Sequence, residues 1–207
     1  TLSEASTDFI QSDITVSGGT LSNWNAASAT SYSATFTPTN NSTANGVISV
    51  GNAAFTDAAN NSNQDAADAN NSVTFNVDTI RPTIAITDDD EDNSLGVGDT
   101  SALTFTLSEA STDFIQSDIT VSGGTLSNWN KASATSYSAT FTPTNNSTAN
   151  GVISVADGTF SDAAGNANND GSDANNSVTF TVDTRPPAPS PSPRPAPSPT
   201  PTPAPTP

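Results

Sequence analysis

Apolar residues alternate with Thr and Ser along most of this chain, and a period of two predicts half-buried β-strands. In the second half of the chain the alternation predicts strands over residues 83–87, 102–108, 118–122, 136–142, 151–155 and 177–182. The side chains expected in the core are Ile84, Ile86, Leu103, Phe105, Leu107, Ile119, Val121, Tyr137, Ala139, Phe141, Ile153, Val155, Val178, Phe180 and Val182. Trp129 and its counterpart Trp24 are expected to cap the cores. Short strands separated by turn formers predict an all-β fold of tandem immunoglobulin-like antiparallel sandwiches.

The two halves of the chain repeat each other. Residues 1–79 align without a gap on residues 106–184 at an offset of 105, and 12 of the 79 aligned positions differ. A period of this length corresponds to one small domain and is too long for a solenoid unit. We therefore predict a first repeat over residues 1–79, a complete repeat over 80–184 and a tail over 185–207.

The first repeat has no counterpart of residues 81–105, which hold the first predicted strand and most of the second. A sandwich without these strands leaves apolar rows unpaired. Either chain upstream of Thr1 supplies them, which we favour, or a neighbouring subunit donates them by β-augmentation.

The composition excludes several kinds of function. The chain has 21 acidic and 4 basic residues, for a net charge of −17, and this acidity disfavours nucleic acids and anionic membranes as partners. It has no His and no Cys, which removes Ser-His-Asp and Cys-His catalysis, the usual zinc sites and disulfides. No 18-residue apolar run suggests membrane insertion. We expect no enzymatic activity and no organic cofactor.

An acidic loop over residues 88–99 predicts a calcium site. Asp88, Asp90 and Asp92 occupy positions 1, 3 and 5 of a loop of the EF-hand type, and Asp99 occupies position 12. The five carboxylates of residues 88–92 would repel one another strongly without a counter-ion. A second acidic set in the later loops consists of Asp157, Asp162, Asn166 and Asp170. The alternative is an acidic, solvated turn that keeps an edge strand soluble.

Asparagine sequons and a proline-rich tail are candidate glycosylation sites. The Asn-x-Ser/Thr sequons begin at Asn40, Asn41, Asn60, Asn70, Asn145, Asn146 and Asn175. Asn is also common in turns, and turn chemistry alone explains many of these positions. From Pro186 onward the chain holds 12 of its 15 prolines, which predicts a polyproline II rod of roughly 65–70 Å. The candidate acceptors in the tail are Ser190, Pro191, Ser192, Pro193, Ser198, Pro199, Thr200, Pro201, Thr202, Pro203 and Thr206, and the alternative is a bare, semi-rigid spacer.

Several motifs occur in an order that resembles a known family. They are DNSLGVGDTSALTFTLSEASTDFIQSDITVSGGTLSNW, then YSATFTPTNNSTANGVISV, FSDAAGN and a closing VDT-x-x-P. From Thr1 to Thr184 they resemble the bacterial Ig-like repeats of large surface adhesins and biofilm proteins. The resemblance implies extracellular spacers that bind calcium in loops and between domains. The tail, with its alternating Ala-Pro, Ser-Pro and Thr-Pro, is similar to hydroxyproline-rich glycoproteins of green algae and plants, which implies modified, glycosylated prolines.

These observations together favour a structural extracellular protein. We expect the repeats to act as struts that self-associate into a surface filament, an appendage or a cell-wall layer. Calcium is expected to stiffen their loops and junctions, and covalent glycans to cover them. The alternative is a spacer stalk of a calcium-dependent cell-surface adhesin.

Overall fold

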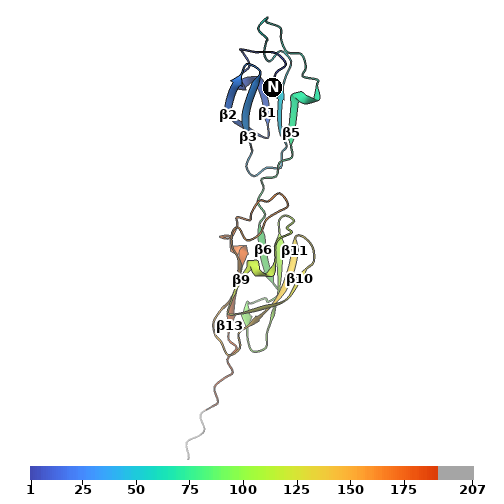
Figure 1. The fold of residues 1–207 in the computed structure, drawn as a ribbon. Helices are drawn as coiled ribbons and strands as arrows, with labels where there is room; N and C mark the ends of the chain where they lie inside the picture. Colours follow the sequence, from blue (N-terminus) through green and yellow to red (C-terminus); the bar gives the residue numbers. More distant parts are fainter. Residues whose placement is uncertain (191–207) are drawn as a thin grey trace, which may run out of the picture.

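The computed structural model describes residues 1–190, which form two β-sandwich units joined end to end by a short linker (Figure 1). The candidate tail acceptors from Pro191 onward lie outside the described residues. Four single turns of 3₁₀-helix accompany the strands: η1 Gln11–Asp13, η2 Ala69–Asn71, η3 Gln116–Asp118 and η4 Ala174–Asn176. Within residues 1–190 there is no helix of the length and apolar character needed to cross a membrane.

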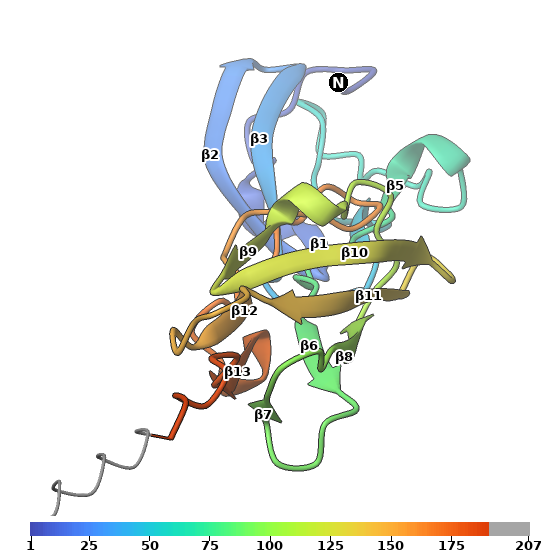
Figure 2. The same cartoon turned by 90° about the horizontal axis from the view of Figure 1, so that it is seen from below.

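The second repeat is a complete two-sheet sandwich. Its strands are β6 Ile84–Asp88, β7 Ser94–Leu95, β8 Ser101–Leu107, β9 Ile119–Ser122, β10 Gly124–Lys131, β11 Ser136–Pro143, β12 Gly151–Val155 and β13 Ser177–Val182. They form sheets of order β10-β11-β8-β6 and β7-β13-β12-β9, and Figure 2 shows β10 and β11 side by side. All pairings are antiparallel except that of β7 with β13. This strand order is that of an immunoglobulin-type sandwich, which confirms the predicted fold class.

The first repeat has only part of this sandwich. Its strands are β1 Ile14–Ser17, β2 Gly19–Ser28, β3 Ser31–Pro38, β4 Gly46–Val50 and β5 Ser72–Phe75. They form one sheet of order β1-β4-β5 and a second of only β2 and β3. Counterparts of β6, β7 and β8 are missing from residues 1–79, as the sequence predicts. Whether residues 1–79 and 80–184 are separate folding units stays a prediction.

The core of the second repeat contains the predicted inward-facing side chains, with Val121 half-buried at its margin. Three further apolar residues are buried, namely Leu95, Phe114 and Phe160. Phe114 packs edge-on against Tyr137 and Phe160 at ring-centroid distances of 5.0 and 5.1 Å. Trp129 stacks on Tyr137 at 5.5 Å and covers the core as predicted.

The sequence analysis did not predict β7 and β10. The first has only two residues, too few for a period. The second carries only Leu126 and Trp129 on its inner face, and its register shifts between Ser127 and Asn130, where Asn128 has a φ of 54°. A bulge of this kind breaks the alternation on which strand prediction depends.

Candidate metal centre at the junction of the repeats

The linker between the repeats is hydrogen-bonded to both of them. On the side of the first repeat, the Thr79 amide donates to the Ser42 carbonyl at 3.0 Å and the Thr79 hydroxyl donates to the Thr39 carbonyl at 2.8 Å. On the side of the second repeat, the Asn166 side-chain amide donates to the Asp78 carbonyl at 3.1 Å. The Arg81 guanidinium donates to the carbonyl of Ala167 at 3.3 Å. These bonds fix the path of residues 78–81.

Three carboxylates from different parts of the chain meet at this linker. Asp78 belongs to the linker, Glu109 follows β8, and Asp162 lies in the loop between β12 and β13. One carboxylate oxygen of each lies within 4.8 Å of the other two. Among residues 1–190 this is the one group of three or more potential metal ligands that come so close together.

Asp162 is held in place by a tight turn. Its Oδ1 accepts hydrogen bonds from the amides of Ala164 and Asn166 at 2.8 and 2.9 Å, and its Oδ2 accepts one from the Asn166 side chain at 2.8 Å. Gly165 adopts a φ of 89°, which this turn requires and glycine adopts readily. Burial of Asp162 disfavours its ionised form, but the hydrogen bonds outweigh burial and hold its pKa below the ordinary value. The Asp162 carboxylate is therefore ionised and held in a fixed orientation.

Glu109 is the member of the group whose ionised form is disfavoured. Desolvation, followed by the negative charges of Asp78 and Asp162, raises the pKa of Glu109. Its Oε2 is buried and has no hydrogen-bond partner. A buried oxygen without a donor is costly, and a cation, a water molecule or protonation of Glu109 relieves this cost. Oxygen ligands of this charge fit a hard divalent cation, with backbone carbonyls and water completing its coordination.

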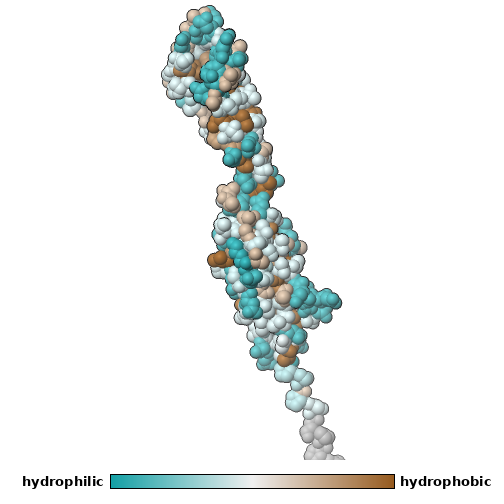
Figure 3. Space-filling view, turned by 90° about the vertical axis from the view of Figure 1, so that its right-hand side faces the viewer, coloured by the Kyte–Doolittle hydropathy of each residue, from teal (hydrophilic) through white to brown (hydrophobic). Residues whose placement is uncertain are grey.

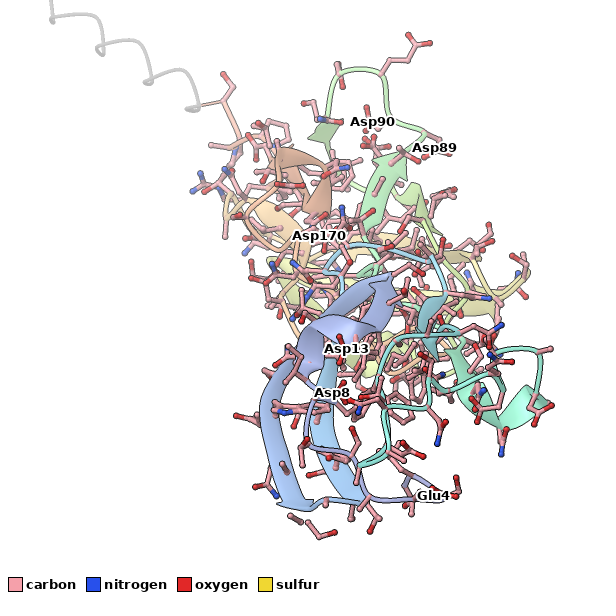
Figure 4. All side chains as sticks on the ribbon, turned by 90° about the horizontal axis from the view of Figure 1, so that it is seen from above. Glu4, Asp8, Asp13, Asp89, Asp90 and Asp170 are labelled. Atoms are coloured by element: carbon pink, nitrogen blue, oxygen red, sulfur yellow. The ribbon has the colours of Figure 1, made fainter. Side chains whose placement is uncertain are left out.

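The predicted loop ligands are engaged differently. One oxygen each of Asp88, Asp90 and Asp92 accepts a hydrogen bond from the backbone amide two residues further on, at 3.0, 3.2 and 3.1 Å. Asp99 accepts the Gly96 amide at 2.9 Å. Figure 4 shows Asp89 and Asp90 at the β6–β7 loop. Within residues 1–190 these four carboxylates form no close group of three, and calcium binding by this loop stays a prediction.

Of the second predicted set, only Asp162 joins the junction group. Asp170 is buried, and its Oδ2 accepts the Ile84 amide at 2.5 Å, which ties the start of β6 to the loop before β13. Asp157 accepts the Gly171 amide at 2.6 Å. Both carboxylates therefore hold the loops around the core together, and a metal role for them stays a prediction.

The candidate glycosylation sites of the described residues are accessible. All seven sequon asparagines and Ser190 are exposed. Asn41, Asn60 and Asn146 have φ values of 53°, 64° and 57°, so turn geometry accounts for asparagine at these positions. Glycosylation stays a prediction.

The sequence analysis missed Asp78 and Glu109. Recurrence gave no signal for them. Asp78 corresponds to Asp183, and Glu109 and Asp162 correspond to Glu4 and Asp57, but the repeats differ at only 12 of 79 positions, so most other residues recur as well.

The chain belongs to the bacterial Ig-like domain family, whose model matches residues 1–76 and 78–182. This family is typical of surface proteins and is usually non-catalytic. No curated protein matched the chain.

Proposed function

We propose that this chain is a structural extracellular protein, in which the repeats are struts and a calcium ion braces the junction between them. The observation that carries the proposal is the meeting of Asp78 of the linker with Glu109 and Asp162 of the second repeat, with the buried Oε2 of Glu109 left without a partner. Calcium suits this group because it accepts carboxylates in irregular geometry.

A cation at this place would resist bending of the junction. It would tie the linker after β5 to two separate loops of the second repeat. Hydrogen bonds of Asn166 with Asp78 and of Arg81 with Ala167 already join the linker to one of these loops. The end-to-end arrangement of the units in Figure 1 gives the chain reach, and antiparallel strand pairs resist extension. A braced junction would transmit load from one repeat to the next.

The struts would assemble by self-association into a surface filament, an appendage or a cell-wall layer. Glycans on the exposed sequons and on the tail would cover the assembled surface. The second candidate function is a spacer stalk of a calcium-dependent adhesin, which the family's occurrence in surface proteins favours. Electron microscopy of the purified protein separates the two, because assembly predicts regular polymers and a stalk predicts isolated pairs of beads at all protein concentrations.

Calcium binding is tested by thermal unfolding of the full chain in calcium and in EGTA. At a calcium concentration of about 100 times Kd, we expect stabilisation of about 2.7 kcal/mol. Glu109→Gln should abolish most of this effect. Glu4→Gln is the matched control, because it changes the same residue of the first repeat, and its calcium response should remain. Equal melting temperatures in calcium and EGTA for the unchanged chain would contradict the proposal.

Mass spectrometry of peptides released from the protein of its natural source tests the glycans. Glycosylation predicts that sequon peptides, such as those that hold Asn145 and Asn175, have masses above those of their amino-acid sequences. Sequon peptides found only at their unmodified masses would show that these sites carry no glycan.

A further inference from the structure

The basic residues of this chain are placed so that proteases of the trypsin class have one peptide bond to cut. These enzymes cut after Lys or Arg, and the chain has 4 such residues. Arg81, Arg185 and Arg194 are each followed directly by proline. Proline has no backbone N–H and its ring crowds the preceding residue, so the bond between Arg and Pro fits such a protease poorly. The remaining candidate is the bond between Lys131 and Ala132.

The linker between the repeats shows what proline protects. Arg81 in the linker is exposed, and Figure 3 shows that the molecule is narrow between the two repeats. An exposed connection of this kind is a preferred place for proteolytic cleavage. Pro82 follows Arg81, is itself buried, and blocks the bond between them. Cleavage after a basic residue is therefore directed away from the linker and into the second repeat.

The bond after Lys131 lies at the exposed tip of the β10–β11 hairpin. Lys131 is the last residue of β10, and Ala132 and Ser133 follow it in the turn, where all three are exposed. Two hydrogen bonds close the turn, from the amides of Ala132 and Ser133 to the Ser136 carbonyl at 3.0 and 3.1 Å. The first repeat has Ala26 in place of Lys131, so its hairpin offers no such bond.

The tip of this hairpin can open while the rest of the repeat stays folded. β10 is an edge strand, and its register with β11 shifts between Ser127 and Asn130, so that only Asn130 and Lys131 are paired beyond the shift. β11 is held independently on its other side by β8. The Lys131 side chain would leave only its contacts with Ser111 and Tyr137, which are weak at an exposed ammonium. A short, interrupted edge pairing opens at a lower free energy than core strands do.

The two parts of a chain cut at this bond would stay paired. Residues 1–131 keep β6, β7, β8, β9 and β10 of the second repeat, and residues 132–207 keep β11, β12 and β13. In one sheet β11 lies between β10 and β8, and in the other β13 and β12 lie between β7 and β9. The core holds side chains of both parts, such as Phe105 and Phe141. Strand pairing and apolar burial would therefore keep the parts together.

We propose that the bond between Lys131 and Ala132 is a processing site for a trypsin-like serine protease. In the hydrolysis, the bond between the Lys131 carbonyl carbon and the Ala132 nitrogen breaks. Water adds its hydroxyl to that carbon and its hydrogen to that nitrogen. The second repeat would then be held by strand pairing alone, folded at rest but able to part under load, which would release residues 132–207. This inference goes beyond the proposed function and does not depend on calcium.

The test treats the folded, full chain with trypsin. We expect one cut, which gives fragments of residues 1–131 and 132–207 in mass spectrometry under denaturing conditions. Size-exclusion chromatography without denaturant should elute both fragments together at the position of the uncut chain, and concentrated urea should separate them. The rate of cutting should depend only weakly on low concentrations of urea, because local opening of the tip exposes little surface.

Three variants at exposed positions check the choice of bond. Lys131→Gln should abolish the cut. Pro186→Ala should add a second cut, after Arg185, because alanine restores the backbone N–H and removes the ring. Pro187→Ala is the matched control, since it leaves Pro186 in place, and it should add no cut.

Several results would overturn the proposal. They are a folded chain that trypsin leaves whole, cuts after an arginine of the unchanged chain at a similar rate, and a cut at residue 131 that persists in Lys131→Gln. Fragments that part without denaturant would also overturn it. So would a urea dependence of the cutting rate as steep as that of global unfolding, because the cut would then require the whole repeat to unfold.

Discussion

The two repeats place the same side chains in different surroundings. Phe180 lies at the centre of a closed sandwich, whereas Phe75, in an identical strand, lies at an open face. Both pack a neighbouring ring in the same way, since Phe141 and Phe180 stack at 5.4 Å and Phe36 and Phe75 at 5.3 Å. The stacking of the two rings is thus determined by residues that both repeats share. The burial of Phe180 depends in addition on β6 and β8, which follow the linker and belong to the second repeat. The comparison gives a series of matched substitutions.

The largest difference is expected for the paired phenylalanines. Phe180→Ala should lower the free energy of unfolding of the second repeat by about 3–5 kcal/mol, because it leaves a cavity in a closed core. Phe75→Ala should cost the first repeat about 1–2 kcal/mol, since water already reaches this side chain. Urea unfolding of the full chain, followed by Trp fluorescence, measures both. Equal losses would mean that the open face is covered in solution.

The next difference concerns a buried asparagine. The Oδ1 of Asn168 accepts amides of Thr159 and Phe160 at 2.9 and 3.3 Å, and its Nδ2 donates to the Ala156 carbonyl at 2.9 Å. Asn63 makes the equivalent bonds in the first repeat but is only half-buried. Asn168→Ala should cost about 2–4 kcal/mol and Asn63→Ala about 1 kcal/mol, because water can replace the lost bonds only at Asn63. The same unfolding measurement compares them, and a larger loss at Asn63 would contradict this account.

A smaller effect is expected from acid. Hydrogen bonds from the Thr56 hydroxyl, the Thr56 amide and Ser6 lower the pKa of Asp8 from 3.8 to about 2. Since the folded-state pKa lies below the unfolded value, the stabilisation is complete above about pH 4 and is lost as the pH falls towards about 2. Asp8→Asn should remove this part of the pH dependence in the first repeat. An NMR titration of the Asp8 carboxyl with its midpoint at the ordinary value would contradict the prediction.

The smallest effect is expected at one of the positions where the repeats differ. Lys131 donates to the Ser111 carbonyl at 3.4 Å and lies 5.4 Å from the centre of the Tyr137 ring, whereas the first repeat has Ala26 at this position. Lys131→Ala should cost the second repeat no more than about 0.5–1 kcal/mol, because the ammonium is exposed. A loss as large as that of Phe180→Ala would show that this contact stabilises the core.

The sequence predicted the fold well because strand alternation is local. Phe105 and Phe141 face the core since every second residue of a strand points to one side. Phe114 and Phe160 escaped prediction because they lie in irregular segments that close the sandwich, where no period marks an inward-facing position. Trp129 was placed correctly although its strand was not predicted.

The candidate site was predicted only in part because it is assembled from segments far apart in the sequence. Asp162 was recognised within an acidic loop, but neither Asp78 nor Glu109 lies in a dense acidic run. Only the meeting of the linker with the second repeat brings the three together. The run at residues 88–92 is more conspicuous, yet Asp88, Asp90 and Asp92 accept hydrogen bonds from amides of their own loop.

The most direct test of the calcium-braced junction is a measurement of residual dipolar couplings for both repeats in calcium and in EGTA. A braced junction predicts that the two repeats share one alignment tensor in calcium and align separately in EGTA. Asp78→Asn in calcium should behave like the unchanged chain in EGTA. Couplings of the unchanged chain that are the same in calcium and EGTA would contradict the account.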